Sequence, residues 1–299
     1  SAVRLLLNIF RTGLFENPYL DPAETAATVG NPEFMKAGFE AQLRSVILLK
    51  NKNGILPLHK GIRVYMPKKH IPGGRNWFGM ETPERWVDAL NPEIAGRYFT
   101  LTDKAEEADA ALVCIDSPKG GTGYSPEEAA QGGNGYLPIS LQYTPYTAVE
   151  ARAASLAGGS PFESFTNRSY RGKSVTTAND LDLKAVADTR NLMGDKPVIV
   201  VVKLSNPMIF SEVEPSASAI LVHMGVQDQA LLDLLTGAAE PSALLPFQMP
   251  ADMATVEKQA EDVPRDLSCH TDSEGNSYDF AFGMNWKGVI SDPRVARYR

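Results

Sequence analysis

One irregular stretch of this chain, residues 117–179, contains four glutamates, a residue type that can act as a general acid or base. They are Glu127, Glu128, Glu150 and Glu163, and the stretch around them is rich in Gly, Ser, Pro and Tyr. A carboxyl group that aromatic neighbours remove from water has a raised pKa, which suits it to general acid catalysis. In the sequence SPFESFTNRSY, Glu163 has aromatic residues on both sides. The alternative for each glutamate is a solvated loop carboxylate, because most exposed glutamates do no chemistry.

The length of this stretch also points to function. Loops of more than about 15 residues without regular structure are uncommon in compact domains and are usually functional or disordered. Five tyrosines and two phenylalanines argue against disorder, because aromatic side chains can anchor a loop to a surface. Within it we predict only a short helix near Thr147–Leu156. We therefore expect an ordered loop insertion that contacts another surface.

A second glycine-rich loop, PKKHIPGGRNWFG, follows a predicted strand and contains Trp77. Ligands of open α/β sheets bind outside the carboxyl ends of the strands, so Trp77 is a candidate binding residue. Equally, it can be a tryptophan that simply packs under a long loop.

Several other kinds of site are disfavoured by the sequence. There is no Gly-x-Ser-x-Gly motif, and the four histidines lack the context of a paired nucleophile; His223, within a predicted strand, is interpreted as a core histidine. The GGTG and GGNG clusters lack the strand-then-helix setting of a phosphate loop. No metal-ligand spacing is present, so we expect neither a metal nor another cofactor. The two cysteines, Cys114 and Cys269, are predicted to be separate thiols.

Composition narrows the class of protein further. The chain has 299 residues, of which 43% are hydrophobic, and its net charge is -7. A sizeable core is possible, and the negative charge without a Lys/Arg cluster disfavours nucleic acid as a partner. No apolar run approaches the roughly 18 residues that a membrane-spanning helix needs, and the apolar part of the first residues is too short for a complete signal peptide.

Short apolar runs define the expected fold. The strongest is Val198–Val202, five β-branched residues without polar alternation, which is typical of a strand buried on both faces of a parallel sheet. Further strands are predicted at Arg63–Met66, Ala110–Ile115 and Ser218–Met224, and a short extended piece at Leu244–Pro250. Helices are predicted at Pro83–Leu90, Asp180–Met193 and Gln229–Thr236, and the tail after Ala251 is predicted to be irregular. This alternation indicates an α/β fold, a three-layer α/β/α sandwich around a mostly parallel sheet of five or six strands, with the loop insertion at 117–179.

The first 30 residues have a different character. We predict a helix at Val3–Phe10 and an extended connector over Gly13–Pro22, followed by a helix that begins at Asn31 and continues to about Leu49. We therefore expect residues 1–30 to be an interdomain linker and residues 31–299 to be one α/β domain.

Four stretches, in order along the chain, resemble the C-terminal domain of family 3 glycoside hydrolases, the β-glucosidase-like enzymes. GLFENPYLDP resembles the exit from the first domain of those enzymes, a TIM-type barrel, and RSVILLKNKNGILPL resembles the entry to their second domain. SALLPFQMP resembles a late strand, and DFAFGMNW resembles the closing motif of the family.

The resemblance implies a retaining glycosidase in which a barrel aspartate is the nucleophile and a second-domain glutamate is the acid/base. This chain contains no barrel, so we expect it to be inactive alone and to have the N-terminal barrel domain of the same enzyme and a carbohydrate substrate as its partners. The resemblance also favours an exported, periplasmic or secreted enzyme.

The family usually carries its acid/base in the window occupied here by residues 117–179, although the usual SGE or YTE motif is absent. Glu163 is our first candidate and Glu128 the second, and Arg168 and Tyr170 can hydrogen-bond sugar hydroxyls or tie the loop to the domain. The alternative function is a non-catalytic carbohydrate-binding or structural partner domain.

Overall fold

Strand β11 (Val198–Lys203) lies inside the central sheet, and its five apolar residues are buried, as the β-branched run predicts. The computed structural model describes residues 1–75, 79–151, 166–260, 263–293 and 295. Strand β11 pairs in parallel with β8 (Ala110–Asp116) on one side and with β12 (Ala219–His223) on the other. The predicted strands at these positions are therefore confirmed.

The sheet has eight strands among the described residues, in the order β14-β13-β1-β12-β11-β8-β2-β7. The remaining bounds are β1 Ile47–Asn51, β2 Arg63–Tyr65, β7 Thr100–Thr102, β13 Met284–Asn285 and β14 Gly288–Val289. The five strands from β12 to β7 are parallel, while β1, β13 and β14 are antiparallel. The expected α/β sandwich with a mostly parallel sheet is confirmed, with eight strands instead of five or six.

One of the additional strands comes from a segment that was expected to be helical. Helix α3 (Pro32–Leu43) ends before the predicted limit at Leu49, and β1 follows. Residues 46–49 are all buried, and alternate side chains contribute to the two opposite cores. A helix at the surface would bury one stripe only, so burial on both faces requires a strand here.

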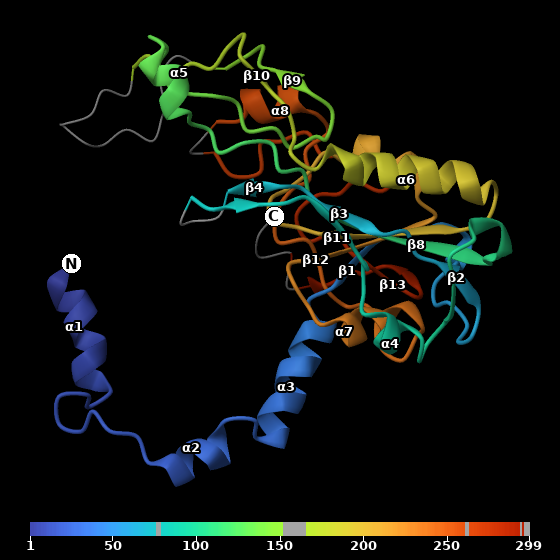
Figure 1. Ribbon diagram of the computed structural model, residues 1–299, viewed down its shortest axis with the longest axis horizontal. Coiled ribbons are helices and arrows are strands. Elements are labelled where there is room, and N and C mark those ends of the chain that lie inside the picture. The colour runs from blue at the N-terminus through green and yellow to red at the C-terminus, as the bar shows by residue number, and fades with distance from the viewer. Residues whose placement is uncertain (76–78, 152–165, 261–262, 294, 296–299) are drawn as a thin grey trace. The chain divides into compact units, whose positions relative to one another are not determined.

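Helices cover the sheet on both faces (Figure 1). On one face, Val186 and Met193 of α6 (Asp180–Met193) pack with Val113 and Val200 of the sheet. On the other face, α7 (Asp228–Leu235) and the short α4 (Pro92–Ala95) pack with the opposite side chains of the same strands, including Leu112 and Val201. The predicted helices corresponding to α6 and α7 are confirmed.

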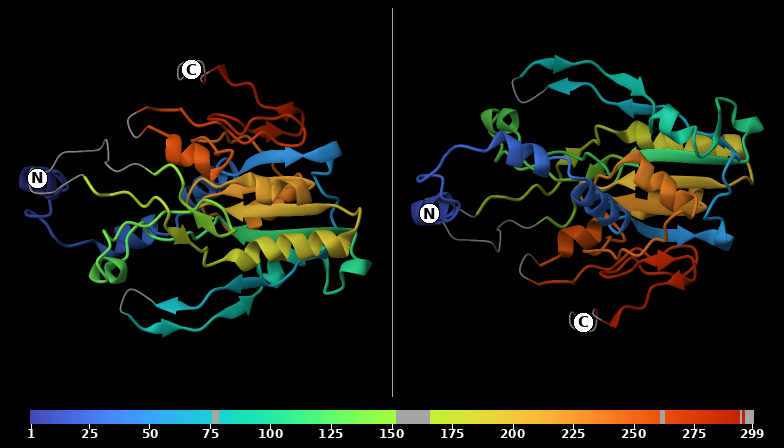
Figure 2. Two further views of the ribbon diagram at one scale, coloured as in Figure 1. Left: turned by 90° about the horizontal axis from the view of Figure 1, so that it is seen from above. Right: turned by 90° about the horizontal axis from the view of Figure 1, so that it is seen from below.

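A two-stranded arm flanks the β2–β7 edge, and the C-terminal segment with β13 and β14 forms the other edge (Figure 2). In the arm, β3 (Lys69–Ile71) pairs with β6 (Arg85–Val87), and β4 (Gly74–Arg75) pairs with β5 (Glu81–Thr82). The helix expected at Pro83–Leu90 is therefore wrong. The bulky residues Trp86 and Val87 favour a strand, and Trp86 contacts His70 across the pair, with ring centroids 5.0 Å apart.

The irregular segments contain short elements. These are α5 (Pro126–Ala130), β9 (Tyr146–Thr147) and β10 (Ser174–Val175) within 117–179, α8 (Met253–Lys258) near the C-terminus, and the 3-10 turns η1 (Lys52–Gly54), η2 (Ala105–Glu107), η3 (Phe210–Glu212) and η4 (Glu214–Ser216). The helix expected near Thr147–Leu156 is contradicted at Thr147, which is in β9, and its end falls outside the described residues. The tail, predicted to be irregular, forms α8, β13 and β14, and Leu244–Pro250 forms no strand beyond a single bridge at Pro250.

The chain consists of two compact units, Ser1–Ala41 and Gln42–Arg299. The first unit contains α1 (Ala2–Arg11), α2 (Pro22–Thr28) and most of α3. The predicted helix at Val3–Phe10 is confirmed by α1, whereas α2 was not predicted. Its start follows from the Asp21 carboxylate, which accepts a hydrogen bond from the Ala23 N–H at 2.7 Å.

Candidate functional site

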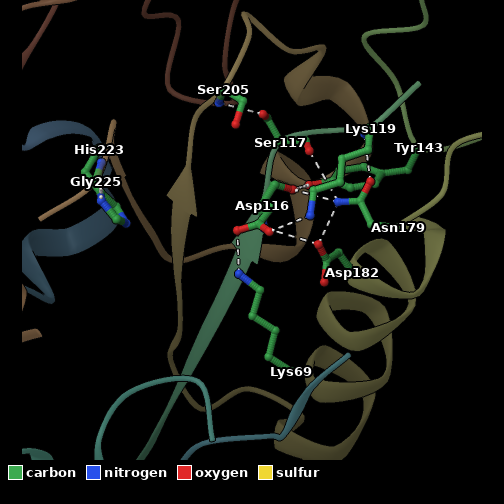
Figure 3. Close-up of polar contacts among 10 residues, drawn as sticks. All are labelled: Lys69, Asp116, Ser117, Lys119, Tyr143, Asn179, Asp182, Ser205, His223 and Gly225. Carbon is green, nitrogen blue, oxygen red and sulfur yellow. Dashed lines mark hydrogen bonds and ion pairs between the residues drawn. The ribbon is translucent and has the colours of Figure 1, made fainter. Parts of the chain in front are cut away.

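The loop insertion 117–179 begins at the carboxyl end of β8 and ends at the start of α6, and one side chain joins these two ends (Figure 3). The buried Asn179 accepts a hydrogen bond from the backbone N–H of Lys119 at 2.7 Å. Its amide nitrogen donates to the Asp182 carboxylate at 2.8 Å and to the Ser117 carbonyl at 3.3 Å. The two ends of the insertion are thereby held together at the edge of the sheet.

Tyr143 returns the middle of the insertion to the same edge. Its ring is fully buried, and its hydroxyl donates to the Asp116 carbonyl, while its backbone N–H donates to the Glu212 carboxylate at 2.6 Å. The Ser117 hydroxyl also accepts a hydrogen bond from the Ser205 N–H at 2.9 Å. An aromatic side chain therefore anchors the described part of the insertion to the sheet edge, the role for which its aromatic content was singled out.

Asp116, the last residue of β8, lies between two lysines (Figure 3). Lys69 of β3 and Lys119 of the insertion both form ion pairs with its carboxylate. Burial raises the pKa of Asp116, but the hydrogen bonds and charges of the two lysines outweigh burial and hold that pKa below its usual range. Asp116 is therefore ionised at neutral pH and links the arm to the insertion.

His223 ends β12 and is buried, which agrees with its interpretation as a core histidine. Its Nδ1 atom accepts a hydrogen bond from the Gly225 N–H at 3.1 Å. Burial, followed by the charges of Lys203 and Lys69, lowers the pKa of His223 to about 4. The imidazole is therefore neutral at physiological pH and carries its proton on Nε2.

Glu128, the second acid/base candidate, forms an ion pair with Lys173. Its carboxylate also accepts a hydrogen bond from the Gly135 N–H. The hydrogen bond from Lys173 is the largest cause that lowers the pKa of Glu128. A general acid requires the opposite shift, so these contacts favour a role for Glu128 in holding the insertion together.

Asn134 connects this ion pair to the candidate sugar-contacting residues. Its oxygen accepts from Lys173, and its amide nitrogen donates to the carbonyls of Asn167 and Ser169, at 3.0 and 2.8 Å. These carbonyls flank Arg168, whose guanidinium lies 5.4 Å from the centroid of the Tyr136 ring. The structure therefore connects Glu128 and Arg168 through one network.

Of the remaining candidates, one tyrosine is half-buried, two glutamates are exposed, and two residues lie outside the described part of the chain. Tyr170 is half-buried, and its carbonyl accepts from the Lys173 N–H at 3.0 Å. Glu127 and Glu150 are exposed. The pKa of Glu127 is lowered by a hydrogen bond from the backbone N–H of the same residue and by another from the Ser125 side chain. Glu163 and Trp77 lie outside the described residues.

Asp116, Asn179 and Lys69 were missed as site residues by sequence reasoning. A usable signal existed for the first two, because Asp116 directly follows an apolar strand and Asn179 directly precedes a predicted helix. Among the described residues, no group of three or more His, Cys, Asp and Glu side chains is arranged to hold a metal ion. No described helix combines the length and apolar character that crossing a membrane requires.

The sheet, its two helical layers and the insertion at the carboxyl edge agree with the family to which the sequence is matched. Residues 46–286 match the glycosyl hydrolase family 3 C-terminal domain, and the chain belongs to that family. It is 30% identical to a probable beta-glucosidase C of Aspergillus flavus over 266 residues, 89% of this chain and 32% of that protein. It is also 26% identical to a periplasmic beta-glucosidase/beta-xylosidase of Dickeya chrysanthemi, with 89% and 31% covered.

Solved structures agree on the fold. A beta-glucosidase from Listeria innocua in complex with gluconolactone superposes with a TM-score of 0.52 at 16% identity, covering 92% of this chain and 38% of that chain. The present chain spans about a third of the length of the curated relatives it matches. It is thus a C-terminal domain of the kind that occurs in longer β-glucosidase-like proteins.

Proposed function

We propose that this chain completes the active site of a retaining β-glycosidase by supplying a sugar-contacting loop and the acid/base glutamate. The observation that carries the proposal is the insertion 117–179, which is fixed by Asn179 and Tyr143 to the carboxyl edge of a family 3 domain. Loops at that edge are where open α/β sheets bind their ligands. The names of the relatives, beta-glucosidase and beta-xylosidase, make a β-linked sugar the expected substrate.

The relatives are longer than this chain. We expect part of their additional length to form an N-terminal TIM-type barrel, which would supply the other half of the site. Retaining glycosidases need two carboxyl groups about 5–5.5 Å apart, one as the nucleophile and one as the acid/base. With only the second group, the chain alone is expected to be inactive.

Glu163 is the proposed acid/base. Its aromatic neighbours would raise the pKa of its carboxyl group, whereas Lys173 lowers the pKa of Glu128. Arg168 is the proposed sugar-contacting cation, because the network through Asn134 fixes the backbone on both sides of it.

The test compares Glu163→Ala and Glu128→Ala in the longer protein that includes the N-terminal region. For Glu163→Ala we expect turnover of substrates with poor leaving groups to fall by about 10²–10⁴-fold, the usual contribution of acid–base catalysis. Azide or an activated aryl leaving group should restore turnover, because neither needs the lost proton transfer. Unchanged kinetics in Glu163→Ala, with azide rescue in Glu128→Ala, would transfer the role to Glu128.

One observation favours a second function, a non-catalytic carbohydrate-binding or structural partner domain. The glutamates of the insertion that the structure describes are either exposed or, for Glu128, paired with a lysine. Calorimetric titration of this chain with glucose and with cello- or laminari-oligosaccharides separates the two functions. Binding by the chain alone supports the module, and absence of binding agrees with half of an interdomain site.

A further inference from the structure

Three polar side chains occupy neighbouring positions at the carboxyl edge of the sheet. The strand register pairs Lys203 at the end of β11 with Asp116 of β8 and with His223 of β12. Residues in register on adjacent strands project from the same face of a sheet. This face is the one that α7 covers, because Val201, two residues before Lys203, packs there with Leu231.

A cavity of about 310 Å³ lies against this row. Its wall combines the apolar or weakly polar side chains of Ile71, Leu90, Cys114, Val201 and Leu231 with the polar side chains of Lys69, Asp116, Lys203, His223 and Asp228. Cavities that bind small molecules occupy about 300–1,000 Å³ and combine apolar walls with a few polar groups. This cavity therefore has room for a ligand of a few carbon atoms.

Two polar side chains of the cavity already have hydrogen-bond partners, whereas two others have donors that are still available. Asp116 is paired with Lys69, and the Asp228 carboxylate accepts from the Asn91 N–H at 2.8 Å. In contrast, Lys203 has no ion pair or hydrogen bond from its ammonium group to any described residue, and its side chain is exposed. Because Nδ1 of His223 accepts from Gly225, its Nε2–H is a second donor, without an acceptor among the described residues.

The unused groups are thus one cation and one N–H donor, whereas both carboxylates of the cavity already accept hydrogen bonds. A neutral polyol would need acceptors as well as donors, while a carboxylate needs donors only. An anion at this position would also form charge-assisted hydrogen bonds, which are stronger than neutral ones.

We propose that this cavity binds a small organic monoanion, whose carboxylate lies between the Lys203 ammonium and the His223 Nε2–H and whose apolar part contacts Leu90, Val201 and Leu231. The cavity is formed entirely within the second compact unit. The inference is therefore independent of the proposed glycosidase function and can be tested on this chain.

The test is an NMR titration of the ¹⁵N-labelled chain with isobutyrate and, in parallel, with isobutyramide, which has the same shape without the charge. Isobutyrate should cause saturable shifts at the amides of Lys203, His223 and Gly225. Isobutyramide should bind about ten- to a hundredfold more weakly, the factor expected when a charge-assisted hydrogen bond is lost. Equal binding of the two probes, or shifts that never saturate, would overturn the proposal.

Variants give an independent check. Lys203→Met should abolish the response to isobutyrate, Lys203→Arg should retain it, and Lys184→Met, which changes an exposed lysine on α6, should leave it unchanged. In the unmodified chain, saturating isobutyrate should also raise the pKa of His223 from about 4, because an adjacent anion favours the imidazolium. Retention of the response in Lys203→Met, or an unchanged pKa of His223, would contradict the assignment.

Discussion

Replacing Asn179 by alanine tests how the loop insertion is held at the sheet. The side chain makes two short hydrogen bonds, with the Lys119 N–H at 2.7 Å and with the Asp182 carboxylate at 2.8 Å, and longer ones to the carbonyls of Asp116 and Ser117 at 3.3 Å. A neutral bond contributes about 1 kcal/mol and a bond to a charged group about 1.5–3 kcal/mol. We expect Asn179→Ala to lower the free energy of unfolding by about 3 kcal/mol.

The pH dependence of this loss is a sharper test than its size. Burial is the main cause that raises the pKa of Asp182, and the Asn179 amide is the first group that opposes it. Without Asn179 the pKa of Asp182 should rise further. A raised carboxyl pKa contributes stability that is present at low pH and is lost as the pH rises through the folded-state pKa. The deficit of Asn179→Ala should therefore be largest at neutral pH and shrink towards acid pH.

Urea denaturation at several pH values measures the deficit, and hydrogen exchange of the Lys119 amide reports the local contact. The control is Asp188→Ala, which removes an exposed ion pair with Lys184 on the same helix and should cost no more than about 0.5 kcal/mol. A deficit below about 1 kcal/mol, or one that grows towards acid pH, would refute the role assigned to Asn179.

Two further predictions concern the Lys50–Glu214 ion pair and the Cys114 thiol. Lys50→Met should lower the free energy of unfolding by about 3–5 kcal/mol, because it leaves the buried Glu214 carboxylate without its ion pair. The control, Lys104→Met, removes an exposed ion pair and should cost less than about 1 kcal/mol. Urea denaturation of both variants measures these costs, and equal costs would contradict the prediction. The Cys114 thiol is half-buried, and desolvation raises its pKa to about 12, so little reactive thiolate is present at pH 8. Iodoacetamide should therefore not alkylate Cys114 at pH 8 until urea unfolds the chain, and mass spectrometry that finds it modified in the native state would contradict the raised pKa.

The central strands were predictable from sequence because burial on both faces excludes polar residues from them. Val198–Val202 and Ala110–Ile115 carry that signal without interruption. The same signal was misinterpreted at Ile47–Asn51, where the preceding helical pattern extends without a break into a strand. Short strands such as Arg85–Val87 depend on a partner that is distant in sequence, so local propensity could not define them.

The site was less predictable than the fold. Asn179, Tyr143 and Asp116 lie together only because the two ends of the insertion meet at the sheet edge, and their separation along the chain hides this contact. Likewise, the cavity beside Lys203 and His223 depends on both the order and the register of the strands, and local sequence defines neither. Residue type indicated which side chains could react, but their pairing required the structure.

The most direct test of the proposed function compares hydrolysis of an activated aryl β-glucoside by this chain alone and by the longer protein that includes the N-terminal region. The chain alone is expected to give no rate above buffer, since one carboxyl group cannot carry out both steps of a retaining mechanism. The longer protein should turn over the substrate. An enzyme-like rate from the chain alone, or an inactive longer protein that is correctly folded, would contradict the account.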